Sequence, residues 1–437
     1  MDIAFINSRQ DPAGRNIREH LHMLLNEEKI WPLAERHTPR FFEVDERLIY
    51  QERIDAAVGA DLIVFISRHS SRHPVPALTV HVTGNFGSAD LGGEARALAP
   101  AAPGWMHALL RNLQQNAPDG YRVSYEVTHH GPTDLSTPSL FIEIGSTHTE
   151  WTDPAAGEAV AASILSAEPG ETIPLIGFGG THYAVRQTEI ALRSRAAFGH
   201  IAPSREVPLL DLEMIWAMAE QSRAVAAYVD KKAVAKAEEA ALDDLLARAG
   251  VPRLTEGEIL EIGALGWDMY RRIRRLAEEI LPGSRIHIHA LRGEGTAVAV
   301  SAARDLIEEV LKSHKTEFID SISKMPVVHL SKGSEEVAPT FITYESEATR
   351  LANDLTTLCV KLLLISESTV VDGDRLLIQK ARFDPDKARR LGVPPGPLFG
   401  KLAGGREIEI EGQQITPAMV QTISERIIHL PGLERHL

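Results

Sequence analysis

Cysteine is almost absent from this chain, since Cys359 is the only one among 437 residues. A single thiol excludes an internal disulfide and also a zinc site built from cysteines. A metal site would therefore have to use histidine and carboxylate ligands. The 18 histidines of the chain make such a site feasible.

The sequence also lacks a long apolar run and an excess of positive charge. No segment approaches the ~20 apolar residues that cross a bilayer, and the first residues enter a strand-like segment without a basic leader. The 46 Lys and Arg residues face 60 Asp and Glu residues, and the net charge of −14 repels polyanions at long range. We therefore expect a cytoplasmic protein with no membrane or DNA partner, in which only a narrow basic groove could hold a nucleic acid.

Three familiar motifs are missing as well. No GxGxxG opens a helix after the first strand, and there is no GxxxxGK[ST], so dinucleotide cofactors and P-loop nucleotide hydrolysis are disfavoured. No GxSxG occurs either, which argues against a serine hydrolase.

The length exceeds the ~250–300 residues at which one hydrophobic core usually stops growing, so we expect two domains. In the first half, mostly continuous apolar runs are typical of strands that are buried on both faces. The expected strands are Asp2–Ile6, Leu62–Ile66, Leu78–Val82, Val123–Val127, Leu140–Ile144 and Ile173–Phe178. The expected helices are Pro12–Asn26, Gly104–Asn116, Pro154–Ser166, Leu209–Tyr228 and Ala233–Ala249. This alternation predicts an α/β fold with a mainly parallel, doubly wound sheet in residues 1–262.

A second, smaller α+β domain is expected in residues 263–437. It begins with a basic helix, Met269–Leu281, which carries four arginines. The expected strands are Ile286–Ala290, Ala297–Val300, Val327–Leu330, Lys361–Ile365 and Leu376–Lys380. The Pro- and Gly-rich segment Gly392–Gly400 is expected to be irregular.

Polar residues follow the expected strands of the first domain, where an open parallel sheet binds its ligands. Neutral imidazole is the commonest zinc ligand, and three protein ligands with one open position make a hydrolytic site. The candidate metal ligands at these strand ends are His69, His81, His129, His130, His182 and Glu94. No HExxH or HxxEH spacing chooses among them.

Glycines at the same strand ends suggest a second feature of the site. The backbone amides around Gly84, Gly179 and Gly180 lack side chains that would keep a ligand away. Such amides suit a phosphate, a carboxylate or an oxyanion.

Taken in order, six motifs resemble those of the archaeal and plant type of D-aminoacyl-tRNA deacylase. The motifs are Asn7–Ala13, Ser67–Ser70, His81–Gly87 with Gly92–Glu94, Glu126–Pro132, Gly177–Tyr183 and Gly199–Ile201. The resemblance covers about residues 1–260, and its THHGP and GGTHY strings are long enough to be specific. It implies a zinc-dependent esterase with a fold akin to peptidyl-tRNA hydrolases and nucleoside phosphorylases.

The resemblance implies hydrolysis of the ester between a D-amino acid and the terminal ribose of tRNA, with one or two zinc ions activating water. The catalytic candidates are then His129, His130, His182 and Glu94, and sequence does not separate the base from the metal ligands. The expected substrate-binding residues are Gly84, Asn85, Gly179 and Gly180 for the oxyanion, and Arg9, Arg68, Arg186 and Arg205 for acceptor-end phosphates.

Two alternatives use the same residues differently. A metal-dependent peptidase or amidohydrolase would share the histidines but cleave amides, and a non-catalytic tRNA-binding protein would need only the arginines and glycines. Residues 263–437 lie outside the resemblance, so they are expected either to bind tRNA through the basic helix or to serve as a structural appendage. We expect a monomer.

Overall fold

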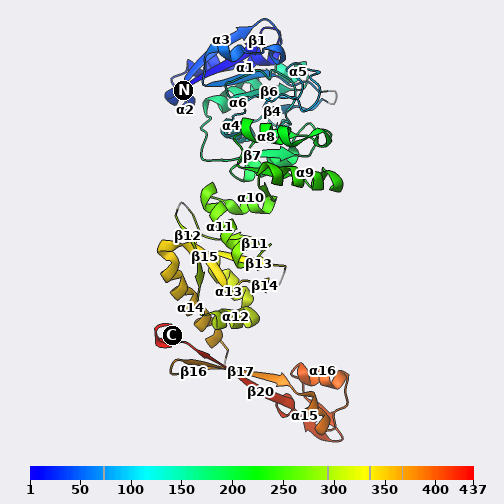
Figure 1. Ribbon diagram of the computed structural model, residues 1–437, viewed down its shortest axis with the longest axis vertical. Coiled ribbons are helices and arrows are strands. Elements are labelled where there is room, and N and C mark those ends of the chain that lie inside the picture. Colours follow the sequence, from blue (N-terminus) through cyan, green and yellow to red (C-terminus); the bar gives the residue numbers. More distant parts are fainter. Residues whose placement is uncertain (72–73, 293–294, 334–335, 367) are drawn as a thin grey trace. The chain divides into compact units, whose positions relative to one another are not determined.

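The computed structural model describes residues 1–71, 74–292, 295–333, 336–366 and 368–437 (Figure 1). The chain divides into two compact units, Met1–Gly263 and Ala264–Leu437. The division falls one residue from the boundary expected at residue 262. In Figure 1 the first unit runs from blue to green and the second continues through yellow to red.

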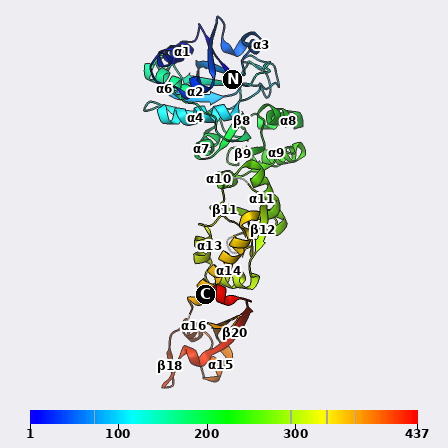
Figure 2. The same ribbon diagram turned by 90° about the vertical axis from the view of Figure 1, so that its left-hand side faces the viewer.

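The first unit contains a six-stranded sheet with the order β2-β1-β3-β6-β4-β5. Its strands are β1 (Asp2–Ser8), β2 (Thr38–Val44), β3 (Leu62–Arg68), β4 (Ala77–His81), β5 (Arg122–Tyr125) and β6 (Ser139–Gly145). Neighbouring strands are parallel except β4 and β6, which are antiparallel. The associated helices are α1 (Pro12–Leu25), α2 (Pro32–Arg36), α3 (Ile54–Val58), α4 (Pro103–Asn116), α5 (His148–Trp151) and α6 (Pro154–Leu165). Helices α1 and α6 pack side by side (Figure 2).

Helix α1 shows how the local sequence positions these elements. The carboxylate of Asp11 accepts hydrogen bonds from the backbone N–H groups of Ala13 and Gly14, which begins the helix. Ile17, Leu21 and Leu24 then follow at helical spacing and are buried. The second carboxylate oxygen of Asp11 ties the helix to the end of β3, so α1 is fixed beside the polar edge of the sheet.

A second sheet has the order β10-β9-β7-β8 and is parallel throughout. Its strands are β7 (Ile173–Phe178), β8 (Ala196–Ala202), β9 (Ala226–Val229) and β10 (Arg253–Leu254). The associated helices are α7 (Val185–Arg193), α8 (Leu212–Gln221), α9 (Lys236–Ala249) and α10 (Glu256–Ile262). The prediction that Ile173–Phe178 joins the first sheet is therefore wrong, because an apolar run reports that a strand is buried but not which strands it pairs with.

The segment that follows β5 joins the two sheets. The N–H of Val127 donates to the carbonyl of His182, and the N–H of Thr128 donates to the carbonyl of Ile201. The carbonyl of Tyr125 accepts from the N–H of Ala184. These bonds hold the loop after β7 against the polar edge of the first sheet.

The expected helix Leu209–Tyr228 is also wrong in part. Asp211 caps the start of α8 by accepting from the N–H of Met214, and the helix ends at Gln221. The last part of the range is β9, which is fully buried between β7 and β10. Alanine-rich apolar runs of this length fit either structure, so only the pairing decides.

The second unit combines a sheet with helices. Its main sheet has the order β11-β13-β15-β12, with β14 beside β13, and β16-β17-β20 form a second sheet. The strands are β11 (Arg285–Ile288), β12 (Ala297–Ser301), β13 (Val328–Lys332), β14 (Glu336–Val337), β15 (Thr340–Tyr344), β16 (Thr369–Asp372), β17 (Arg375–Phe383), β18 (Ile408–Ile410), β19 (Gln413–Ile415) and β20 (Gln421–His429). The helices are α11 (Trp267–Ile280), α12 (Arg304–Ser313), α13 (Lys315–Ile322), α14 (Ala348–Leu364), α15 (Pro385–Arg390) and α16 (Pro397–Ala403).

Two expectations for this unit are corrected. Lys361–Ile365 is not a strand, because Lys361–Leu364 forms the end of α14, whose Leu355, Cys359 and Leu363 face the unit's core at helical spacing. The segment Gly392–Gly400 is not irregular throughout, because α16 begins at Pro397, where a missing N–H costs a helix nothing. Within the described residues, no helix is long and apolar enough to cross a membrane.

Candidate metal centre

Histidines and two glutamates converge at the polar edge of the first sheet. His69 follows β3, His81 ends β4, and His129 and His130 lie in the loop after β5. His182 comes from the loop after β7 and is brought here by the backbone bonds between the two sheets. The glutamates are Glu126, directly after β5, and Glu143, in the middle of β6.

Glu126 lies at the centre of one group, and its side chain is 0% exposed. Its Oε1 lies 3.1 Å from Nδ1 of His69, and its Oε2 lies 2.9 Å from Nε2 of His182. Nε2 of His129 is 3.5 Å from the same Oε2. Three side chains of different strand ends thus point at one carboxylate.

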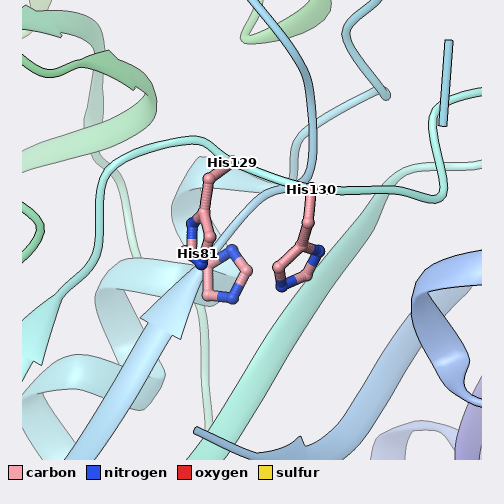
Figure 3. Close-up of side chains that lie close together, drawn as sticks. All are labelled: His81, His129 and His130. Atoms are coloured by element: carbon pink, nitrogen blue, oxygen red, sulfur yellow. The ribbon is translucent and has the colours of Figure 1, made fainter. Parts of the chain in front are cut away.

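The second group consists of His81, His129 and His130, whose rings converge in Figure 3. The ring centroids of His129 and His130 are 4.4 Å apart. The ring centroid of His81 lies 4.6 Å from that of His129 and 4.9 Å from that of His130. Oε2 of Glu143 is 3.6 Å from Nε2 of His81. The geometry also admits a third overlapping group, His81 with Glu126 and Glu143.

Several of these atoms are buried without a hydrogen-bond partner among the described residues. They are both carboxylate oxygens of Glu126, Nε2 of His81 and Nε2 of His182. The short contacts around Glu126 therefore lack hydrogen-bond geometry, and unsatisfied polar atoms of this kind are costly in a folded protein. Imidazole nitrogens and carboxylate oxygens are the ligands that zinc uses where cysteine is absent, so the site fits a zinc ion.

Burial keeps two imidazoles of the second group, those of His129 and His130, neutral. It lowers the pKa of His130 to about 3, and the charge of His81 acts in the same direction. Burial, with His130 and His81 nearby, also holds the pKa of His129 well below its usual value. Burial opposes the charge on His81 too, but contact with Glu143 and the charge of Glu126 raise its pKa overall. Neutral imidazoles are the form that binds a metal.

Their surroundings shift the pKa values of the two carboxylates in opposite directions. Burial opposes ionisation of Glu126, but contact with His182 and the charges of His69 and His81 outweigh it and hold its pKa well below the usual value. Burial raises the pKa of Glu143. Two nearby acids with opposite shifts suit different tasks, such as metal ligation and proton transfer.

Further contacts orient the imidazoles. Nε2 of His69 lies 3.1 Å from the hydroxyl of Tyr183, which leaves Nδ1 facing Glu126. Nδ1 of His129 contacts the carbonyl of Val127 at 2.8 Å, so Nε2 faces the cluster. Such outer partners fix the ring and the tautomer of a ligating histidine.

The cluster opens into a pocket of about 550 Å³. His69, His129, His130, His182 and Glu143 all contribute to its lining. The remaining lining side chains include three arginines and an apolar group, namely Arg47, Arg68, Arg205, Leu48, Ile49, Leu91 and Trp151. A small reactive group with an anionic continuation can therefore reach the histidines.

The other expected site residues lie elsewhere or have other partners. Glu94 is exposed and belongs to none of the three groups found among the described residues. Asn85 donates its side-chain amide to the carbonyls of Gly92 and Glu94. A side chain at Gly84 would collide with Leu98, so close packing accounts for that glycine.

The second pair of glycines and two arginines also have local partners. The N–H of Gly179 donates to Ala202 and the N–H of Gly180 to Ser204, so these amides are occupied. Arg9 pairs with Glu43 and Asp45. Arg186 pairs with Glu189 and Glu256 and lines a separate pocket of about 280 Å³. Of the expected arginines, Arg68 and Arg205 line the pocket of the cluster.

Sequence reasoning missed Glu126 and Glu143 as site residues. Glu143 is the one acid inside the buried strand β6, and Glu126 directly follows β5, between the buried Tyr125 and Val127. A buried carboxylate requires a charged partner or a metal, so this placement was the available indication.

An α/β unit with one mainly parallel and one fully parallel sheet, a buried imidazole and carboxylate centre and an open pocket fits the class of metal-dependent hydrolases. The family described as D-aminoacyl-tRNA deacylase matches residues 57–254, which include the whole cluster. A D-aminoacyl-tRNA deacylase from Methanoculleus marisnigri is 61% identical over 437 residues, the full length of both chains. The chain belongs to the D-aminoacyl-tRNA deacylase family.

Shorter relatives match part of the chain. A D-aminoacyl-tRNA deacylase from Methanosarcina mazei is 36% identical over 278 residues, which cover 59% of this chain and 94% of that protein. Among solved structures, the conserved protein of unknown function AF0625 has a TM-score of 0.54 and 35% identity, covering 59% of this chain and 96% of its own.

Proposed function

We propose that this protein hydrolyses the ester bond of D-aminoacyl-tRNA and releases the free D-amino acid and tRNA. The observation that carries the proposal is the convergence of five histidines and two glutamates at an open pocket within the part of the chain that matches the deacylase family. The chain is a hydrolase whose substrate is an aminoacyl-tRNA, and we place its work in the cytoplasm, where charged tRNA is used.

Zinc is the proposed cofactor, with one or two ions bound. One ion would be held by His69, Glu126 and His182, and the other by His81, His129 and His130. When bound, zinc supplies Lewis-acid polarisation of the ester carbonyl and makes water more acidic.

The chain's own residues then position the substrate and move protons. Glu143 lines the pocket, and burial raises its pKa. We propose that its carboxylate accepts a proton from the attacking water and returns it to the leaving ribose oxygen. Leu48, Ile49 and Leu91 form an apolar wall for the amino acid side chain. We keep His129, His130 and His182 as the histidines on which turnover depends.

The acceptor end of tRNA would approach over the arginines that line the pocket. Arg68 and Arg205 belong to this lining, and Arg47 adds a third positive charge. Phosphate oxygens pair well with guanidinium groups. Arg9 and Arg186 do not line this pocket and are weaker candidates for this role.

We propose that the second unit helps to hold tRNA. Its helix α11 buries Met269, Tyr270 and Ile273 and leaves Arg271 and Arg275 exposed. An exposed basic helix can contact phosphates of the tRNA backbone. The Methanosarcina mazei relative carries the same name with a much shorter chain. We therefore propose that the second unit aids tRNA binding and does not supply the reacting centre.

The test compares D- and L-tyrosyl-tRNA side by side, with a D-tyrosyl peptide amide as a third substrate. We expect rapid release of D-tyrosine from tRNA and little from the other two. Cleavage of the peptide amide with no release from tRNA would favour the peptidase alternative. Binding of tRNA without hydrolysis of either ester would favour a non-catalytic binding protein.

A further inference from the structure

One wall of the pocket pairs an arginine with a tryptophan directly beside the cluster. The guanidinium carbon of Arg68 lies 5.1 Å from the ring centroid of Trp151, and both side chains line the pocket. Arg68 immediately precedes His69, a member of the histidine cluster. None of the roles assigned above uses Trp151, and its contact with Arg68 gives that arginine a different role from the phosphate contact considered above.

The backbone and the indole of this pair are firmly anchored. The indole N–H of Trp151 donates to the carbonyl of His69 at 2.9 Å, and the carbonyl of Trp151 accepts from the side chain of Asn16 at 3.1 Å. The N–H of Arg68 donates to the carboxylate of Asp11 at 2.9 Å. Both residues are therefore fixed relative to His69.

The guanidinium of Arg68 is not used in an ion pair. No carboxylate among the described residues forms a salt bridge with it, whereas Arg9, Arg186 and Arg205 all pair with nearby acids. A flat cation stacked on an indole, with its charge unneutralised, presents a surface on which a nucleobase stacks.

The chemistry of the substrate places a base at this point. In an aminoacyl-tRNA the ester and the terminal base are attached to the same ribose, so a base-binding surface must lie about one sugar away from the reacting centre. The indole of Trp151 is hydrogen-bonded to the backbone of His69, whose side chain belongs to the cluster, so the pair lies next to the reacting centre as required.

We propose that Arg68, backed by Trp151, is the stacking platform for the terminal base of tRNA. This inference rests on the proposed function and deepens it. The base lies on the guanidinium of Arg68, and the stack sets the position of the ester relative to the histidine cluster. Arg68 and Trp151 are positioning residues, because they contact the substrate away from the bond that breaks.

The test measures binding of two uncharged tRNAs to the full-length protein, one complete and one lacking only its terminal adenosine. Wild type should bind the complete tRNA about tenfold more tightly, as expected for one base stacked on a side chain. Arg68→Ala and Trp151→Ala should bring this ratio close to one. Trp216→Ala, which removes a half-exposed tryptophan of α8 outside the pocket, is the matched control and should leave the ratio unchanged.

Two conservative variants separate stacking from other roles. Trp151→Phe loses the bond to His69 but keeps an aromatic face, so most of the ratio should survive. Arg68→Lys keeps the charge but loses the plane, so the ratio should fall. A full ratio in Arg68→Lys would identify a phosphate contact instead, and would overturn the platform.

Further outcomes also overturn the proposal. They are equal binding of both tRNAs by wild type, an unchanged ratio in Arg68→Ala, or equal weakening of both tRNAs by a folded Trp151→Ala protein. If Trp151→Ala does not fold, Arg68→Ala and Trp151→Phe still decide. Hydrolysis of D-tyrosyl-tRNA by wild type is measured separately. Equal binding of the two tRNAs by a wild-type protein that hydrolyses D-tyrosyl-tRNA refutes only the platform, whereas absent hydrolysis refutes the proposed function.

Discussion

Replacement of Glu126 by glutamine tests the centre most informatively. Glu126 is fully buried, both of its oxygens lack hydrogen-bond partners among the described residues, and it contacts His69 and His182 at 3.1 and 2.9 Å. Four-ligand zinc sites bind with about 10–16 kcal/mol, or roughly 3 kcal/mol per ligand. Loss of this one anionic ligand should therefore weaken one zinc ion about 100-fold. The group of His81, His129 and His130 does not include Glu126 and should keep its affinity.

The assay is a titration of metal-free protein with zinc in competition with a chromogenic chelator, with circular dichroism as a check on folding. Glu94→Gln is the matched control, because Glu94 was a candidate from sequence but is exposed and outside the three groups. A folded Glu126→Gln protein that binds zinc like wild type would refute the reasoning. A loss of zinc in Glu94→Gln alone would restore the sequence-based candidate.

Three further predictions concern catalysis, tRNA binding and stability. His182→Ala should lower turnover of D-tyrosyl-tRNA by ~10²-fold or more with little change in melting temperature, and a variant that only melts earlier would show that His182 is structural. Changing both Arg271 and Arg275 to glutamine should weaken tRNA binding. The slope of log affinity against log salt should become shallower by about one unit per lost phosphate contact. An unchanged slope would argue that the second unit is a structural appendage. Burial lowers the pKa of His200 to about 4. The unfolded chain, with a pKa near 6.5, therefore takes up the proton first, and folding stability is lost as pH falls between these values. In urea titrations, the free energy of unfolding should fall by about 2 kcal/mol less in His200→Gln than in wild type between pH 8 and pH 5. Equal decreases in the two proteins would count against that pKa.

Much of the first unit was predictable because its strands are short apolar runs with polar residues after them. The same logic placed His69, His81, His129, His130 and His182 in one pool, and the structure brings all five together. Strand ends in a parallel sheet share an edge, so this juxtaposition follows from topology.

Other features depend on pairing that a single sequence does not report. The edge strand β2 is half-exposed and contains Pro39, which disfavours a strand, and β8 contains three alanines and a glycine, which have low strand propensity. Without β8 and β9, the second sheet was not recognisable. His182 reaches the cluster only because that sheet is joined to the segment after β5.

The arginines show a similar limit. Arg9 and Arg186 were expected at the substrate, but their partners Glu43 and Glu256 are 34 and 70 residues away in the chain. An arginine that is neutralised by a distant acid cannot be distinguished from a free one by its local sequence. Glu126 and Glu143 were missed for a different reason. Their neighbours in the chain are apolar, and these segments were interpreted only as strands.

The most direct test of the central claim is reconstitution of metal-free protein with zinc while hydrolysis of D-tyrosyl-tRNA is followed. We expect no hydrolysis without metal, and a rate that rises with added zinc and stops rising at one or two ions per chain. Full hydrolysis by protein shown to be free of metal would contradict it.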